Sequence, residues 1–344
     1  MNILTRDPAR VVSLSFVHTA QKGVFSMAIA KSGNTRSDLV GGKKFGGWSA
    51  SARRRSLVPL MILVFSTIAT VVIAACGSQS SAPSTSTPTS TSQAIPAITI
   101  KAVDYSFQQP KSIPAGLVDI TMTNDGKMNH SLQIFRLNDG VSYDQFFTAL
   151  KNNDPKFVGM LKAYGGANSI LPGQSQEVIL NLEQPGQYVS LCFDSDADNV
   201  PHFMKGMITQ FTVTGSAANQ VQSPKDNGEI VLRDFSFQLP NSIPSGPVTL
   251  KVTNQGPQLH EADIVRLAQG KTLQDLQNFL NQPNPTGAPP FEPAGGMGAI
   301  QAGTSAWLKL NLKPGNYAVL CFVPDAKTSK AHFMLGMLNS FTVQ

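Results

Sequence analysis

From position 97 onward, the apolar residues fall mainly in short runs in which they alternate with polar residues. Alternation with a period of two, β-branched residues and flanking turn residues are typical of half-buried β-strands. The predicted strands are 97–103, 117–123, 131–135, 177–182 and 187–192 in the first half, and 229–232, 248–253, 262–265 and 307–312 in the second. So many short strands predict an all-β fold.

Each half also contains the pattern of one short helix. Ser142 and Thr272 have the character of helix N-caps. Each is followed by two apolar residues spaced four apart, the spacing of one helix face. These pairs are Phe146 with Leu150, and Leu276 with Leu280. Prolines between 283 and 293 then prevent a long continuation of the second helix.

The two halves repeat one another at an offset close to 130 residues. Asp104-Tyr-Ser-Phe107 matches Asp234-Phe-Ser-Phe237, and Ser112-Ile-Pro-Ala-Gly116 matches Ser242-Ile-Pro-Ser-Gly246. A long self-similarity of this kind indicates a duplicated structural unit. Several short strands in roughly 115 residues are typical of a β-sandwich. We therefore predict two tandem Greek-key β-sandwiches, each with a short inserted helix.

The predicted organisation has five parts. They are an N-terminal extension with a lipoprotein-type signal or anchor (1–75), a Ser/Thr/Pro-rich linker (76–97), a first domain (98–215), a second linker (216–228) and a second domain (229–344). The first linker has almost no large apolar residues, so we expect it to act as a flexible tether.

The leader has the features of an export signal. Arg53, Arg54 and Arg55 precede an apolar run at 57–73, and small residues then lead to Cys76. This ending resembles the bacterial lipoprotein signal and favours lipidation of Cys76. The alternative is an uncleaved transmembrane helix, because the run approaches the ~20 residues that span a bilayer. Either anchor predicts that the rest of the chain is extracytoplasmic, on the outer face of the cell membrane.

The net charge of +6 comes from this leader. Residues 1–75 hold ten of the 27 Lys/Arg residues and only two of the 21 Asp/Glu residues, so the remainder is slightly acidic. The high pI of the chain therefore does not indicate nucleic-acid binding.

Two cysteines remain outside the leader, Cys192 and Cys321, at equivalent positions of the two repeats. An exported chain normally pairs its cysteines or uses them chemically. A disulfide between the two would require their loops to meet face to face. Metal ligation explains the pattern better, because each cysteine is followed by a histidine and a methionine in the same loop.

Thiolate, imidazole and thioether groups together form the ligand set that copper prefers, and two His, one Cys and a weak axial Met define the blue-copper arrangement. Four of the five histidines in the chain and both remaining cysteines fall in this pattern. The predicted ligands are His130, Cys192, His202 and Met207 in the first repeat, and His260, Cys321, His332 and Met337 in the second.

Each repeat resembles a cupredoxin domain, the plastocyanin and azurin family of type 1 copper proteins. The matching motifs of the first repeat are Asn124-Asp-Gly-x-x-Asn-His130, Pro185-Gly-Gln-Tyr-x-x-x-Cys192 and His202-x4-Met207. Those of the second are Asn254-Gln-Gly-x-x-Leu-His260, Pro314-Gly-Asn-Tyr-x-x-x-Cys321 and His332-x4-Met337. The resemblance implies a two-sheet fold, one copper ion per domain with His, Cys and His as equatorial ligands and Met as the axial ligand, and one-electron transfer.

One departure from the family pattern concerns the loop between the cysteine and the second histidine. Nine residues separate Cys192 from His202, and ten separate Cys321 from His332. The small electron carriers of the family have only a few residues there. The longer loop calls into question how well each site is preorganised.

These features predict a membrane-tethered copper protein that carries single electrons and is not an enzyme. Copper oxidases and nitrite reductases need additional histidines, commonly as His-x-His, which this chain lacks. The expected partners are exported redox proteins or membrane electron-transfer components. Two alternatives stay open: copper storage or delivery, and a metal-free structural or interaction tandem.

Aromatic and methionine residues follow each second histidine, as Phe203-Met204 and Phe333-Met334. We expect them to form an apolar cover over the exposed edge of the imidazole. A less favoured role for the methionines is as alternative soft ligands.

Three aspartates of the first loop, Asp194, Asp196 and Asp198, alternate as at the start of a calcium-binding loop. The position that requires Gly is Asn199, so a solvated acidic loop is predicted instead. In the second repeat, Glu261 follows a predicted ligand and is expected either to support the site or to be exposed.

Overall fold

The computed structural model describes residues 94–217, 221–282, 285 and 287–344, which belong to one compact unit. The leader with Cys76, most of the predicted tether and part of the second predicted linker lie outside the described residues. Among the described residues, no helix is long and apolar enough to cross a membrane.

The predicted all-β fold is confirmed. The strands of the first repeat are β1 (Ala97–Val103), β2 (Ser106–Gln108), β3 (Ser112–Pro114), β4 (Gly116–Asn124), β5 (Gln133–Leu137), β6 (Leu161–Gly165), β7 (Ser175–Leu182), β8 (Gly186–Leu191) and β9 (Ile208–Thr214). Those of the second are β10 (Glu229–Arg233), β11 (Ser236–Gln238), β12 (Gly246–Asn254), β13 (His260–Leu267), β14 (Phe291–Ile300), β15 (Ser305–Leu312), β16 (Gly315–Leu320) and β17 (Leu338–Val343). The helices are α2 (Tyr143–Lys151) and α3 (Leu273–Leu280), with the 3-10 helices η3 (Pro155–Met160), η4 (His202–Lys205) and η5 (His332–Leu335).

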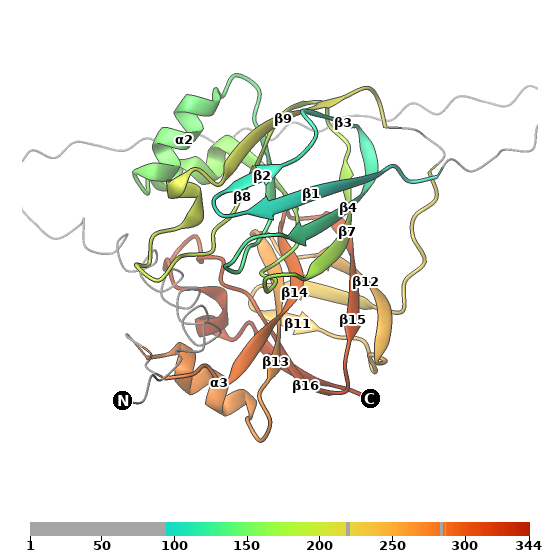
Figure 1. Cartoon of the computed structure of the whole chain (residues 1–344), viewed down its shortest axis with the longest axis vertical. Helices are drawn as coiled ribbons and strands as arrows, with labels where there is room; N and C mark the ends of the chain where they lie inside the picture. The colour runs from blue at the N-terminus through green and yellow to red at the C-terminus, as the bar shows by residue number, and fades with distance from the viewer. Residues whose placement is uncertain (1–93, 218–220, 283–284, 286) are drawn as a thin grey trace, which may run out of the picture. The chain divides into compact units, whose positions relative to one another are not determined.

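These strands form two sheets, and each sheet runs through both repeats (Figure 1). The 8-stranded sheet has the order β11-β10-β12-β15-β7-β4-β1-β2, and the 9-stranded sheet has the order β17-β16-β13-β14-β6-β5-β8-β9-β3. The repeats join where β15 pairs with β7 and β14 pairs with β6, both antiparallel. Each repeat is thus a two-sheet sandwich, as expected, and the sheets continue from one sandwich into the other.

Glutamine side chains reinforce this junction. Gln133 donates to the Ala299 carbonyl oxygen (3.0 Å) and accepts from the Ala299 N–H (2.7 Å). Gln176 forms the same two bonds with Gly296, at 2.6 and 2.9 Å. Gly296 has φ +139°, and a Cβ there would lie 2.3 Å from the Ala262 carbonyl oxygen, so only glycine fits. The reciprocal bonds satisfy buried backbone groups between the repeats.

The alternating pattern explains how the core forms. In β4, Val118, Ile120 and Met122 are buried, whereas Asp119 and Thr121 between them are partly exposed. The corresponding residues of β12 repeat this arrangement. Side chains of both repeats belong to one apolar cluster between the sheets. Burial of one face of each strand is the main driving force for this packing.

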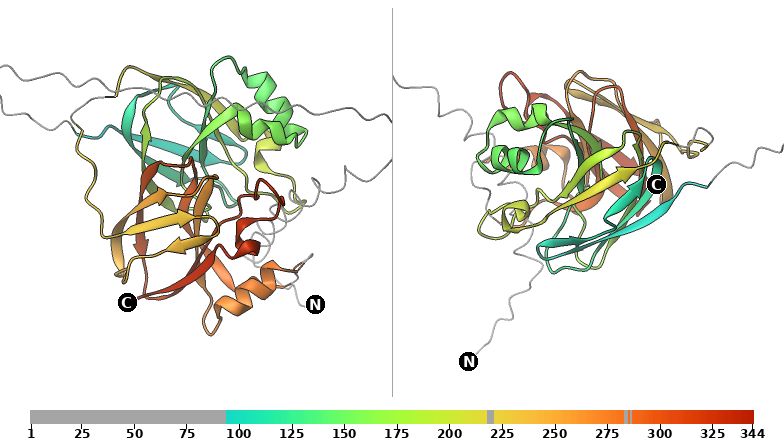
Figure 2. Two further views of the ribbon diagram at one scale, coloured as in Figure 1. Left: turned by 180° about the vertical axis from the view of Figure 1, so that it is seen from behind. Right: turned by 90° about the horizontal axis from the view of Figure 1, so that it is seen from above.

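Both predicted helices are present and begin at the predicted caps. Ser142 accepts from the N–H of Gln145 at 3.2 Å, and the Gln145 side chain accepts from the N–H of Ser142 at 2.9 Å. Thr272 and Asp275 form the same capping box at the start of α3. The helices lie on the outside of the sheets (Figure 2), and Phe146 of α2 belongs to the same apolar cluster as Phe203 of η4.

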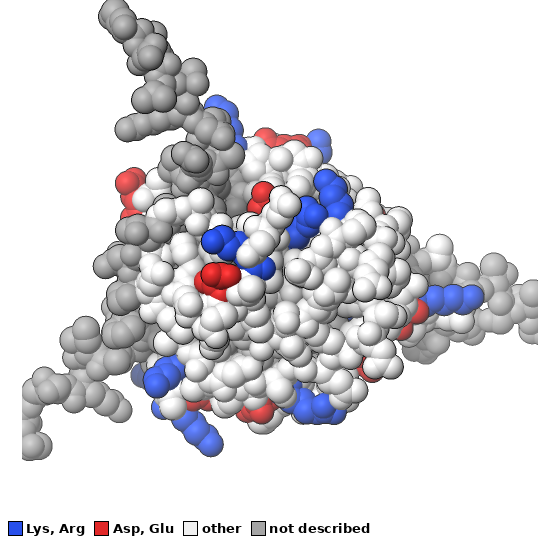
Figure 3. All heavy atoms as spheres, turned by 90° about the horizontal axis from the view of Figure 1, so that it is seen from below, with Lys and Arg blue, Asp and Glu red and all other residues white. Residues whose placement is uncertain are grey.

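The surface charge agrees with the balanced composition outside the leader. On the face in Figure 3, Lys/Arg and Asp/Glu side chains are scattered among mostly uncharged residues. That face therefore has no large area of a single sign.

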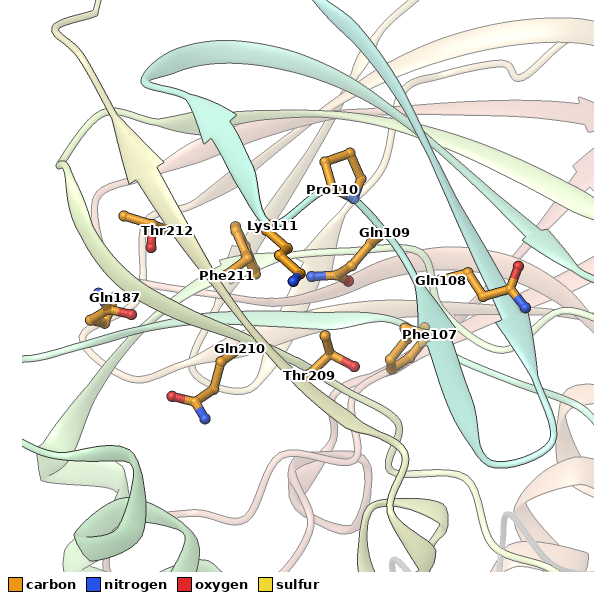
Figure 4. Close-up of a pocket in the computed structure, with 10 residues that line it drawn as sticks. All are labelled: Phe107, Gln108, Gln109, Pro110, Lys111, Gln187, Thr209, Gln210, Phe211 and Thr212. Atoms are coloured by element: carbon orange, nitrogen blue, oxygen red, sulfur yellow. The ribbon is translucent and has the colours of Figure 1, made fainter.

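A groove of about 510 Å³ opens on the first repeat beside β2 and β9 (Figure 4). The amide of Gln109 points into it, and neither its oxygen nor its nitrogen has a hydrogen-bond partner although both atoms are buried. The equivalent residue of the second repeat is Leu239, which packs against the core. An unpaired buried amide costs free energy that the leucine does not.

We predict that Gln109→Leu stabilises the protein. Removal of the unpaired amide should raise the free energy of unfolding by about 1–3 kcal/mol, measured by denaturant unfolding. The reverse change in the second repeat, Leu239→Gln, is the matched control and should destabilise by a similar amount. If Gln109→Leu instead lowers the free energy of unfolding, the Gln109 amide makes an interaction that stabilises the fold.

Candidate metal centres

The predicted ligands of each repeat meet at one end of its sandwich. In the first repeat, His130 lies between β4 and β5, Cys192 directly follows β8, His202 begins η4 and Met207 directly precedes β9. All four side chains are buried. The equivalent residues of the second repeat are buried in the same way: His260, Cys321, His332 and Met337.

In the first cluster, three possible ligand atoms face one another. The Nδ1 atoms of His130 and His202 are 3.1 Å apart. The Sγ atom of Cys192 is 3.9 Å from the first of these nitrogens and 3.6 Å from the second. The three atoms thus form a small triangle closed off from solvent.

The second cluster has the same geometry. The Nδ1 atoms of His260 and His332 are 3.0 Å apart, and Sγ of Cys321 is 3.4 Å from Nδ1 of His332. All three ligand atoms lie within 4.8 Å of one another. Both cysteines are free, so the alternative of a disulfide is not realised.

Backbone hydrogen bonds hold each methionine beside its cysteine and histidine. The N–H of Cys192 donates to the Met207 carbonyl oxygen (3.1 Å), and the N–H of Met207 donates to the His202 carbonyl oxygen (3.0 Å). Cys321, Met337 and His332 repeat both bonds, at 3.3 and 3.0 Å.

The long loop between cysteine and histidine folds back on itself. The N–H of His202 donates to the Asp194 carbonyl oxygen at 2.7 Å, and Ser195 pairs with Pro201 as in a short hairpin. In the second repeat, His332 bonds to Val323 at 2.9 Å. The additional residues therefore form an excursion that returns the histidine to the cysteine, and the cluster is preorganised despite the loop length.

An aspartate that sequence analysis did not assign to the site anchors the first histidine of each cluster. Oδ1 of Asp104 lies 2.8 Å from Nε2 of His130, and Oδ1 of Asp234 lies 2.6 Å from Nε2 of His260. A carboxylate in this position keeps the proton on Nε2 and leaves Nδ1 free as a ligand. The sequence contains a sign of this role, because the Asp-x-Ser-Phe motif occurs at the same place in both repeats.

The electrostatics around this hydrogen bond favour a neutral imidazole beside a charged carboxylate. Desolvation alone would raise the pKa of Asp104, but hydrogen bonds from His130 and from the N–H of Lys127 outweigh it and lower the pKa. Burial lowers the pKa of His130 despite its bond to the carboxylate.

The second histidine of each cluster is even less basic. Burial, followed by the charge of the neighbouring His130, lowers the pKa of His202 to about 4. Burial and the charge of its own neighbour, His260, lower the pKa of His332 to about 4. In addition, Nε2 of each is buried without a hydrogen-bond partner. Protons therefore compete weakly for the inward-facing nitrogens at neutral pH.

Burial raises the pKa of both thiols, so a metal ion must displace the proton before the sulfur can bind it. Backbone groups already point at the sulfur atoms. The N–H of Ser131 donates to Sγ of Cys192 (3.3 Å), and the N–H of Glu261 donates to Sγ of Cys321 (3.5 Å).

The prediction of a solvated acidic loop was wrong for two of its three aspartates. Asp194 is buried and accepts hydrogen bonds from the hydroxyls of Ser169 (3.0 Å) and Ser131 (3.4 Å). Asp196 is also buried and forms an ion pair with Lys205. The hairpin turns both side chains inward.

Carboxylates of both repeats lie near the clusters; Asp194 and Asp263 are buried and Glu261 is partly buried. Desolvation raises the pKa of Asp194 to about 7 and that of Glu261 to about 7, and it raises the pKa of Asp263 well above its usual value. The negative charge of Asp194 contributes to the increase at the other two residues, which come from the other repeat. Glu261 also accepts from the N–H of Phe322 (2.7 Å), so it supports the second site.

The structure confirms only part of the predicted apolar cover. Phe203 and Phe333 are buried in the cores, while Met204 and Met334 are 39% and 41% exposed. The imidazoles themselves are fully buried, so no ring edge reaches the solvent. The methionines are the more exposed apolar side chains of this predicted cover.

The spacing of the ligand atoms fits a bound transition-metal ion. Bonds of about 2.0–2.1 Å to nitrogen and about 2.3 Å to sulfur are typical of zinc. Such bonds separate ligand atoms by roughly 3–4 Å, since the ion lies between them. The nitrogen–nitrogen and nitrogen–sulfur distances of 3.0–3.9 Å fall in this range.

No family model and no curated protein matches the chain. Among solved structures, the chain is similar to reduced auracyanin from the photosynthetic bacterium Roseiflexus castenholzii, with 22% identity over 36% of this chain and 100% of that one (TM-score 0.25). Auracyanin A of Chloroflexus aurantiacus, a blue copper protein, is 15% identical over 34% of this chain and 99% of its own (TM-score 0.24). Copper nitrite reductase from Nitrosomonas europaea is 16% identical over 72% of this chain and 93% of its own (TM-score 0.21). At these low TM-scores, the functional assignment depends on the two clusters.

We predict that Asp104→Ala weakens metal binding at the first cluster. Loss of the carboxylate that orients His130 should reduce affinity about 10–100-fold. Zinc affinity, measured by competition with a coloured chelator in a Cys321→Ser background, checks this. The exposed neighbour Asp125 provides the control, and Asp125→Ala should bind as tightly as the parent. Equal affinity in both variants would contradict the anchoring role.

We also predict a pH-dependent gain of stability in metal-free Asp194→Asn. Between about pH 4 and 7, native Asp194 keeps a proton that the unfolded chain has released, so the stability of the parent falls as pH rises. The variant lacks this loss and should be more stable by up to about 4 kcal/mol above pH 7. Denaturant unfolding at pH 5 to 8 measures the difference.

The control for this prediction is Asp198→Asn, an exposed position in the same loop. It should retain the pH dependence of the parent. If Asp194→Asn also retains it, Asp194 is not the group responsible.

Proposed function

We propose that this chain is a one-electron carrier with one type 1 copper site in each repeat. The observation that carries the proposal is the pair of closed His–Cys–His triangles, each with its inward nitrogens 3.0–3.1 Å apart. A buried methionine adjoins each triangle through backbone hydrogen bonds. Two histidines, a cysteine and a weak axial methionine form the donor set of blue-copper centres.

The donor set favours copper over the other common ions. Calcium and magnesium prefer oxygen ligands. Zinc fits the distances, but copper binds a given site of this type more tightly, and the adjacent thioether is a soft ligand suited to Cu(I). The sites would therefore be held by His130, Cys192, His202 and Met207, and by His260, Cys321, His332 and Met337.

Bound copper supplies a couple, Cu(II)/Cu(I), that accepts and releases one electron without making or breaking a bond in the protein. The role of the chain is to keep the ligands nearly still during this change. Asp104 and Asp234 fix the first histidines. The backbone N–H groups of Ser131 and Glu261 fix the sulfur atoms. Buried, hydrogen-bonded ligands keep their positions in both oxidation states, which lowers the barrier to electron transfer.

An electron carrier is proposed in preference to a copper enzyme. All four histidines of the described residues belong to the two clusters. None remains for a second type of copper centre, at which oxidases and reductases bind their substrates. The exposed side chains beside the sites, Met204 and Met334, instead offer an apolar surface for a protein partner.

The proposal includes the location of the protein. The leader supports export and attachment to the outer face of the cell membrane, through a lipid on Cys76 or through the apolar run at 57–73. A flexible tether over 76–97, as the sequence predicts, would allow both sites to reach exported redox proteins or membrane electron-transfer components.

Copper storage or delivery is the second candidate function. The observation that favours it is the exposure of Met204 and Met334 beside the sites. Thioethers at the surface are suited to exchange of Cu(I).

The experiment loads the full-length chain, purified in detergent, with Cu(II) and then removes free metal by dialysis. We expect two copper ions per chain and an intense thiolate-to-copper absorption band. Cys192→Ser and Cys321→Ser should each remove about half of the band, because each leaves one site. Bound copper without the band would favour storage or delivery, and no retained copper would exclude both copper functions.

A further inference from the structure

The two clusters have the same ligands but different charges around them. We infer that the first site has the higher reduction potential, so that an electron shared by the two sites resides mainly on the first. This inference rests on the proposed function, because it concerns copper bound by the same residues.

A cation lies close to the second histidine of the first site only. The Tyr105 ring contacts His202, with ring centroids 5.1 Å apart. Nζ of Lys205 lies 4.9 Å from the centroid of the same tyrosine ring and pairs with Asp196. The charge of the buried carboxylate is thus balanced beside the site.

The second repeat keeps the carboxylate but lacks the cation. Leu335 is the counterpart of Lys205, and Phe235 contacts His332 with ring centroids 4.9 Å apart. Asp325 is buried and accepts hydrogen bonds from neutral groups: the Gln258 amide (3.0 Å), and the N–H and the hydroxyl of Thr328 (both 2.7 Å). These bonds satisfy the carboxylate without neutralising its charge.

The remaining acidic groups do not reverse this difference. Asp104 and Asp234 are equivalent. Of the other carboxylates near the sites, Asp194 belongs to the first loop, whereas Glu261 and Asp263 lie beside the second site. If all three are ionised the second site gains one more negative charge, and if all are protonated the unbalanced Asp325 still remains.

Exposed charges of the two loops would shift the two reduction potentials in the opposite direction, but their effect is weak. Asp198 lies in the first loop, and Lys327 and Lys330 lie in the second. Among the described residues, none of these side chains forms an ion pair. Water and salt screen such unpaired charges more than they screen Lys205, which is partly exposed but paired with the buried Asp196.

The sign of the effect follows from Coulomb's law. Oxidised copper carries one more positive charge than reduced copper, so a more negative environment stabilises the oxidised state. The second site should therefore be oxidised more easily. Electrons that enter there should move to the first site, which gives the chain an internal direction.

The test measures each site alone in the full-length, copper-loaded chain. Cys321→Ser leaves the first site and Cys192→Ser leaves the second, and redox titration follows the thiolate-to-copper band of each. We expect the ratio of oxidised to reduced copper at a given potential to differ at least tenfold, which equals 59 mV for a one-electron couple.

Exchange of the two non-equivalent residues then tests the cause. Lys205→Leu should lower the potential of the first site, and Leu335→Lys should raise that of the second. The control Lys156→Leu changes an exposed lysine in η3, which lies outside the ligand-bearing loops in sequence, and should have no effect.

The outcomes separate the inference from the function on which it rests. If neither single-site protein has the absorption band, the proposed function fails and the inference fails with it. Bands with equal or inverted potentials overturn the inference alone. So do unequal potentials that respond to neither Lys205→Leu nor Leu335→Lys.

Discussion

The hydrogen bond between an aspartate and a buried histidine is the constraint on which each cluster depends. A polar imidazole in an apolar core is costly unless its nitrogens are satisfied. Asp104 satisfies Nε2 of His130, and Asp234 does the same for His260. The inward nitrogen is left as the acceptor that a metal ion requires. Because each aspartate follows the first strand of its repeat, this bond also ties the β1–β2 and β10–β11 turns to the loops that hold the other ligands.

The periodic part of the fold and the chemistry of the site could be predicted from sequence. Alternation located β1 and β4 because one face of each strand is buried and the other is not. The caps at Ser142 and Thr272 located the helices, because a capping box depends only on local residues. Each predicted cysteine meets the first histidine of its repeat because β5 pairs antiparallel with β8, and β13 with β16, which places both residues at the same end of the sheet.

The remaining features depend on contacts between distant residues. β14 contains the sequence Phe291-Glu-Pro-Ala-Gly-Gly-Met-Gly-Ala-Ile300, which has no strand periodicity. It is extended because β13 pairs with it along one side and β6 adjoins it on the other. The burial of Asp194 and Asp196 was missed because it depends on how a nine-residue loop folds back, and loop sequence alone does not specify this.

The continuity of the sheets also determines how the molecule avoids aggregation. The strands β7 and β15 pair with each other, and so do β6 and β14, so these edges are covered where the two repeats meet. Three of the four outer edges are formed by β2, β3 and β11, which have only three residues each. Short edge strands are poor templates for pairing between molecules. A repeat separated from its partner would expose the edge of β7 or β15, each of which has eight residues, so the two halves protect each other from aggregation as well as sharing a core.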